Sequence, residues 1–129
     1  MNNIQNKQPT EEFKINWTAA CHASALLGVL LPFGNIIGPV ALWIVNKDKY
    51  PEVMNEGKIA INFQTTISLA LFALGAVISI LSISHPMMAY YYLSAHLTSW
   101  IPIAFAGFKS YKLLNGERFE YPFSFRFIK

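Results

Sequence analysis

The sequence predicts an all-α integral membrane protein in which three to four membrane segments form a compact bundle with short cytoplasmic tails. The first observation is composition: 53% of the 129 residues are hydrophobic and 13% are charged, whereas a soluble domain carries about 25% charged residues. The second is that residues 15–46 and 59–108 contain no Lys, Arg, Asp or Glu. Because an ionised side chain costs roughly 2.5–3.5 kcal/mol at the centre of a bilayer, such stretches are typical of membrane helices.

The net charge of +3 does not indicate a nucleic-acid partner. The excess of positive charge lies in residues 109–129, and no basic stripe runs along the chain. The partners that we expect are membrane lipids, together with further copies of this chain or another membrane protein.

The first membrane segment is expected over residues 17–46, after a cytoplasmic tail at residues 1–16. As one straight helix it would be about 45 Å long, which is too long for an untilted crossing. Its middle contains residues that break helices: Pro32, Gly34, Gly38 and Pro39. The segment therefore either kinks within one crossing or turns back as a hairpin. We favour the hairpin because it gathers all 10 Lys and Arg on one side, and its second arm, residues 36–46, is short enough to be re-entrant.

A charged cytoplasmic loop is expected at residues 47–57, followed by a two-helix transmembrane hairpin at residues 58–109. The charge-free stretch there is about twice the roughly 20 residues that cross a bilayer. Pro86 marks its turn, because proline lacks a backbone donor. In the last segment, residues 110–129, aromatic residues recur with period two, which predicts an extended chain with one apolar face. The Arg and Lys residues beside it suit a cytoplasmic headgroup layer.

Small residues at helical spacing predict where the helices pack, because helices in lipid approach each other closely only where side chains are small. One stripe lies on the first segment and another on the long helix that follows residue 58: Ala20, Ser24 and Gly28, and Gly75 with Ser79. The Leu, Ile and Phe side chains on the other faces are expected to contact acyl chains.

Polar residues within the charge-free stretches are the candidate functional residues. His22 is expected to donate an interhelical hydrogen bond, and Asn35 to bond the backbone groups that the helix break frees. Gln64 is expected near the inner interface, and Asn62 with Thr66 either lines an inward crevice or is hydrated among the headgroups. No metal or cofactor is expected, because no two of the His residues are three or four positions apart and no carboxylate lies within these stretches.

No set of residues for catalysis stands out, because every carboxylate falls in a tail or loop, whereas nucleophilic or acid–base chemistry needs poised groups. We therefore expect a non-enzymatic membrane subunit. Two alternatives stay open. One is a lipid-active enzyme at the inner interface that uses His22 or Glu56. The other is an oligomeric channel or carrier for a small solute, lined by Asn35, Asn62, Gln64 and Thr66.

Several features, taken in order, resemble a known family: residues 22–28 (HASALLG), residues 32–39 (PFGNIIGP), Trp43, the pair Lys47–Asp48, residues 57–64 (GKIAINFQ) and the pair Tyr121–Pro122. The chain resembles small bacterial membrane proteins of unknown function that are similar to the twenty-kilodalton subunit of the chloroplast inner-envelope protein translocon (Tic-twenty-like). This resemblance implies a helical integral protein of the bacterial cytoplasmic (inner) membrane. The charge-free stretches and the placement of Lys and Arg predict a multi-pass protein with a cytoplasmic C-terminus. The resemblance also implies a role in moving or assembling polypeptides, by fold-level analogy.

Overall fold

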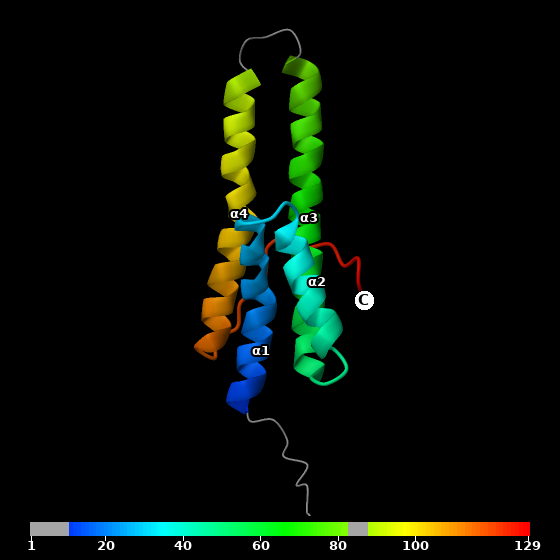
Figure 1. The fold of residues 1–129 in the computed structure, drawn as a ribbon, viewed down its shortest axis with the longest axis vertical. Coiled ribbons are helices and arrows are strands. Elements are labelled where there is room, and N and C mark those ends of the chain that lie inside the picture. The colour runs from blue at the N-terminus through cyan, green and yellow to red at the C-terminus, as the bar shows by residue number, and fades with distance from the viewer. Residues whose placement is uncertain (1–10, 83–87) are drawn as a thin grey trace, which may run out of the picture.

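The computed structural model describes residues 11–82 and 88–129, with side chains for residues 14–80 and 100–129. In this part of the chain four α-helices follow one another: α1 (Glu11–Ala23), α2 (Gly34–Asn46), α3 (Pro51–Ser82) and α4 (Met88–Leu114) (Figure 1). A short 3-10 helix, η1 (Ser24–Val29), extends α1. These residues contain no strand, so the predicted all-α class is confirmed for them.

The chain reverses direction between η1 and α2 (Figure 1). The N–H groups of Leu30 and Leu31 both donate to the carbonyl of Leu27, which closes the last turn of the first arm. Phe33 then adopts a left-handed φ of 60° immediately before α2 begins. We call α1, η1 and α2 together the first hairpin.

The residues predicted to break the helix play different parts in the first hairpin. Pro32 lies exposed in the turn, and Pro39 is buried within α2, which continues past it. Gly34 and Gly38 allow α2 to approach η1 closely, because a Cβ atom on either glycine would collide with the backbone of η1. Pro86 lies outside the described residues.

The helices α3 and α4 run side by side and continue well beyond the turn of the first hairpin (Figure 1). The first hairpin packs against only the half of this pair that contains the start of α3 and the end of α4. The core lies in that half, where buried side chains from several elements meet: Ala25, Val53, Phe63 and Ala106.

By length and composition, α3 is the one helix among the described residues that could cross a membrane, and α2 is apolar but shorter. With 32 residues, α3 is about 48 Å long, more than the hydrocarbon core of about 30 Å. Its second half exposes large apolar side chains, among them Leu69, Phe72, Val77 and Ile80. The loop expected at residues 47–57 is helical from residue 51 onward, because α3 begins at Pro51. Proline suits the first position of a helix, where a backbone N–H would have no partner within the helix.

After α4 the chain returns over the bundle without regular secondary structure, as residues 117–129. Gly116 permits the turn with a left-handed φ of 72°. The ring of Phe119 packs against the rings of Phe105 and Phe108 on α4. Figure 1 shows the segment passing from the end of α4 to the outer side of α3. We call residues 117–129 the tail.

Candidate functional site

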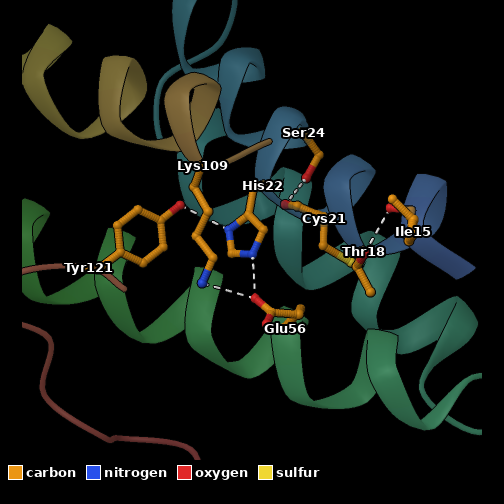
Figure 2. A network of polar contacts seen from close by, with 8 residues as sticks. All are labelled: Ile15, Thr18, Cys21, His22, Ser24, Glu56, Lys109 and Tyr121. Atoms are coloured by element: carbon orange, nitrogen blue, oxygen red, sulfur yellow. Dashed lines mark hydrogen bonds and ion pairs between the residues drawn. The ribbon is translucent and has the colours of Figure 1, made fainter. Parts of the chain in front are cut away.

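A buried group of polar side chains joins three helices and the tail (Figure 2). It consists of His22 from α1, Glu56 from α3, Lys109 from α4 and Tyr121 from the tail. Nε2 of His22 lies 2.9 Å from Oε2 of Glu56, and its Nδ1 lies 2.9 Å from the hydroxyl of Tyr121. Nζ of Lys109 lies 3.0 Å from the same oxygen of Glu56. We call these residues the Glu56 cluster.

The neighbours of His22 determine where its proton lies. A carboxylate can only accept hydrogen bonds, so Nε2–H of His22 donates to Glu56. In the neutral imidazole this leaves a lone pair on Nδ1, which accepts a hydrogen bond from the hydroxyl of Tyr121. In this geometry His22, on α1, donates a hydrogen bond to a residue of α3.

Glu56 and Lys109 form an ion pair that is largely withdrawn from water. The side chain of Lys109 is 3% exposed and that of Glu56 is 25% exposed. The ammonium group also lies 4.9 Å from the ring centre of Tyr121, within the range of cation–π attraction. Because a buried charge without a partner costs several kcal/mol, Glu56 is the group that makes the burial of Lys109 tolerable.

Tyr121 is held on three sides, by its hydroxyl, its ring face and its ring edge. Its ring stacks on the ring of Phe63, with the centroids 3.8 Å apart and an angle of 5° between the planes. The ring of Phe119 lies nearly perpendicular to it, with the centroids 6.0 Å apart. Burial, and then the negative charge of Glu56, raise the pKa of the Tyr121 hydroxyl above its usual value. The phenol therefore stays protonated and serves as a hydrogen-bond donor, so the arrangement acts as a clamp between the helices and the tail.

The local sequence of α1 makes room for the imidazole. The buried apolar residues nearest to His22 in the sequence are all small: Ala19, Cys21 and Ala25. The hydroxyl of Ser24 donates to the carbonyl of Cys21 at 2.7 Å (Figure 2). Such backbone bonds satisfy a hydroxyl inside its own helix, which leaves the ring of His22 as the group that reaches across to α3 and the tail.

A second polar group lies at the turn of the first hairpin. Nδ2 of Asn35 donates to Oε1 of Gln64 at 3.0 Å and to Oγ of Ser68 at 2.9 Å. Nε2 of Gln64, which is fully buried, donates to the carbonyl of Pro102 on α4 at 2.9 Å. We call Asn35, Gln64 and Ser68 the hairpin-tip group. Asn35 thus bonds side chains of α3, whereas freed backbone groups of the break were the expected partners.

A third polar set lies along one face of α3, where Lys58, Asn62 and Thr66 are spaced one turn apart. Nδ2 of Asn62 donates to the carbonyl of Ile128 at 3.0 Å, while its Oδ1 accepts from the N–H of the same residue at 2.9 Å. Oγ1 of Thr66 accepts from the N–H of Phe125 at 2.9 Å, and Nζ of Lys58 donates to the carbonyl of Lys129 at 2.8 Å. We call these three residues the polar stripe of α3; it holds the backbone of the tail.

The small residues chosen for helix packing divide into two groups. Ser24 and Gly28 lie on the face of the first arm that meets α2, where a Cβ atom on Gly28 would come within 2.9 Å of the side chain of Asn35. Ala20 lies half-buried on α1. A Cβ atom on Gly75 would meet no atom within 4 Å, and the exposed Ser79 donates a hydrogen bond to the Gly75 carbonyl within α3. Within the described residues the Gly75–Ser79 face of α3 therefore packs against nothing.

Four members of these polar groups were missed as site residues by the sequence reasoning: Lys58, Ser68, Lys109 and Tyr121. Glu56 was named only for the enzymatic alternative and was otherwise placed in a solvated loop. Lys109 could have been found from its position, because it is the first charge after the long charge-free stretch. Among the residues that the structure describes, no group of three or more His, Cys, Asp or Glu could hold a metal ion.

Comparison with known proteins gives one result and corrects one expectation. No curated protein and no solved structure matches the chain. A family model, MamF/MmsF, matches residues 14–128. The resemblance to Tic-twenty-like proteins is therefore wrong, and the role in moving polypeptides that it implied is withdrawn. Two of the motifs that suggested it have structural roles here: residues 32–34 reverse the chain, and Gly57, inside α3, lets that helix lie close to Trp43 of α2. By the match over residues 14–128, the chain belongs to the magnetosome magnetite crystal formation protein family.

Proposed function

We propose that this chain is a small multi-pass membrane protein that acts as a non-enzymatic subunit in magnetite crystal formation at the magnetosome membrane. The family match over nearly the whole chain is the observation that carries the proposal. Family membership and the apolar helix α3 both indicate a membrane location. The mutual bonding of the polar groups in the Glu56 cluster supports a structural role for them.

In the proposed topology α3 and α4 cross the bilayer as a hairpin, and the first hairpin enters from one side without crossing. The turn of the first hairpin reaches Ser68, which accepts a hydrogen bond from Asn35. From Lys58 to Ser68 the rise along α3 is about 15 Å, about half of the roughly 30 Å hydrocarbon core. The first hairpin would then end near the middle of the bilayer, as a re-entrant segment.

The hydrogen bonds of the turn support this depth. Backbone at membrane depth is tolerated only where protein groups satisfy it, and the N–H groups of Leu30, Leu31 and Gly34 all have backbone partners. The hairpin-tip group adds side-chain bonds between α2, α3 and α4 at the same level. Polar bonds between helices are a common means of association in lipid, where apolar contact supplies little drive.

Charge supports the orientation. Lys58 starts the apolar part of α3 and Lys109 ends that of α4. Lys14 lies in the first turn of α1 and Lys47 directly follows α2, and Figure 1 shows these two helix ends at the same end of the bundle as the start of α3. The positive-inside rule predicts that this end faces the cytoplasm. The N-terminal segment at residues 1–16, the loop expected at residues 47–57 and the tail at residues 117–129 would then all lie on the cytoplasmic side.

Cysteine accessibility tests the topology. In a Cys21→Ala background, the single-cysteine variants Asn55→Cys and His85→Cys would each be treated with a membrane-impermeant maleimide. The treatment would be done on right-side-out and on inside-out vesicles. We expect Asn55, which is exposed at the start of α3, to react only from the cytoplasmic side, and the cysteine at position 85 only from the opposite side. Reaction of both from one side would contradict the proposed crossings.

Deletion of the gene in a magnetite-forming host tests the role. Electron microscopy should show altered crystal size or number in the deletion strain, with recovery when the intact chain is restored. Crystals that are indistinguishable from those of the parent strain would contradict a role in crystal formation. Restoration with the Glu56→Gln variant would show whether the Glu56 cluster is needed for that role.

A further inference from the structure

We propose that the last part of the tail, residues 122–129, lies within the bilayer leaflet next to the cationic end of the bundle and presents its phenylalanine side chains to lipid acyl chains. This inference rests on the proposed crossing of α3. It adds a membrane-contacting surface in a segment expected to stay among the headgroups.

The tail runs antiparallel to α3 along the polar stripe. Phe125 is bonded to Thr66, Ile128 to Asn62 and Lys129 to Lys58, so a later tail residue meets an earlier residue of α3 each time. These bonds fix the height of the tail relative to α3. Thr66 is about 12 Å along the helix axis from Lys58, which places Phe125 well inside a core about 30 Å thick.

Protein groups bond the backbone of the tail at four of its last five residues, Phe125, Phe127, Ile128 and Lys129. In water an exposed, irregular segment can bond solvent, whereas in lipid each N–H and C=O needs a protein partner. Asn62 supplies both a donor and an acceptor to Ile128, and Thr66 supplies an acceptor to Phe125. The N–H of Phe127 donates to the carbonyl of Phe125 at 3.2 Å. Side chains of α3 thus stand in for the water that a surface segment would use.

The outward face of the tail is apolar and aromatic. Phe123, Phe125 and Phe127 are 87%, 73% and 54% exposed. In water these three rings would be exposed hydrophobic side chains. Leu69 and Phe72, on the turns of α3 that follow Thr66, are likewise apolar and exposed. Lipid acyl chains are the partner that fits both surfaces.

Arg126 is the one charged residue between Phe123 and Ile128, and it is exposed. Its position between the levels of Asn62 and Thr66 puts its Cα about 9 Å from the level of Lys58. A long arginine side chain spans most of such a distance and keeps its guanidinium among the headgroups while its methylene groups lie in lipid. The charge is therefore compatible with a tail at this depth.

Site-directed spin labelling tests the proposal in the full chain, reconstituted in phosphatidylcholine–phosphatidylglycerol vesicles. In a Cys21→Ala background, nitroxides would be attached to Phe125→Cys, to Phe72→Cys on the exposed face of α3, and to Asp48→Cys in the exposed connection between α2 and α3. We expect the labels at 125 and 72 to collide at least fivefold more often with oxygen than with a water-soluble nickel chelate. The label at 48 should show the reverse preference.

The three positions distinguish failure of this inference from failure of the topology. A nickel-accessible label at 125 with a lipid-exposed label at 72 would overturn the tail proposal and leave the crossing of α3 intact. Nickel access at both positions would overturn the crossing as well. A label at 125 that is shielded from both reagents would show that protein, such as a second copy, covers the phenylalanines, and would also overturn the proposal.

Discussion

Nζ of Lys109, near the end of α4, lies 3.0 Å from a carboxylate oxygen of Glu56, near the start of α3. The same oxygen accepts the Nε2–H of His22 from α1. One carboxylate therefore ties together the ends of three helices. The contact also holds the tail indirectly, because His22 accepts a hydrogen bond from the hydroxyl of Tyr121.

Replacement of Glu56 by Gln should destabilise the protein, because it leaves the buried Lys109 without a counter-charge. Loss of one partner of a fully buried pair costs about 3–5 kcal/mol. Since Glu56 is 25% exposed, solvent screening reduces the expected loss to roughly 2–4 kcal/mol. The unfolding free energy in mild detergent would be measured by titration with a denaturing detergent.

The matched control is Glu52→Gln, one turn earlier on α3. Glu52 pairs with Lys14 at 3.7 Å and its side chain is 49% exposed, so its loss should change stability by less than about 1 kcal/mol. Equal effects of the two substitutions would show that the pairing of Glu56 contributes nothing beyond a surface ion pair.

Replacement of Tyr121 by Phe should weaken the attachment of the tail while keeping the aromatic stack on Phe63. The substitution removes the donor to Nδ1 of His22, and a buried acceptor left without a partner costs about 1–3 kcal/mol. Protease cleavage of the tail should become faster than in the parent chain. Tyr111→Phe, at a residue of α4 that is 62% exposed, should leave the cleavage rate unchanged; a matching increase in that control would argue against a specific role for the Tyr121 hydroxyl.

Alanine at Gly38 and at Gly75 should have opposite effects on stability. A Cβ atom on Gly38 would collide with the carbonyl oxygen of Ser24, whereas one on Gly75 would meet no atom within 4 Å. Gly38→Ala should therefore cost at least about 1–3 kcal/mol through overpacking. Gly75→Ala should gain up to about 1 kcal/mol from helix propensity.

The same pair of variants examines the predicted packing stripe of α3. Thermal unfolding and size-exclusion chromatography in mild detergent would be compared for both. If Gly75→Ala destabilises the protein or shifts a defined oligomer towards monomer, a partner helix covers Gly75 and Ser79, and the expectation of an open face fails.

The features that the sequence predicted well depend on neighbouring residues, and those that it missed depend on how helices are rotated against each other. Pro32 and Gly34 mark a chain reversal because turn chemistry is local. The pairing of Glu56 with Lys109 joins residues far apart in the chain and depends on the register between α3 and α4. Asn62 and Thr66 illustrate the same limit. Their spacing of one helical turn indicates that they share a face of α3. It does not indicate whether that face meets a crevice, lipid headgroups or the backbone of the tail.

Paired substitutions at Asn35 and Gln64 should show that the hairpin-tip group works as a unit. Gln64→Leu alone leaves Asn35 with Ser68 as its hydrogen-bond partner on α3 and deprives the carbonyl of Pro102 of a donor. Asn35→Leu alone leaves the buried oxygen of Gln64 without its donor. The double substitution should cost less unfolding free energy than the sum of the two single substitutions. Removal of both polar partners leaves neither of them as an unsatisfied buried group.

The expected coupling energy between the two positions is about 0.5–2 kcal/mol, since hydrogen bonds between helices in membranes average about 0.6 kcal/mol and reach about 1.7. A double-mutant cycle on unfolding free energies in bicelles would measure it. Strict additivity, with the double variant losing the sum of the two single losses, would show that Asn35 and Gln64 contribute separately. In that case the contact at 3.0 Å would not be what anchors the first hairpin to α3.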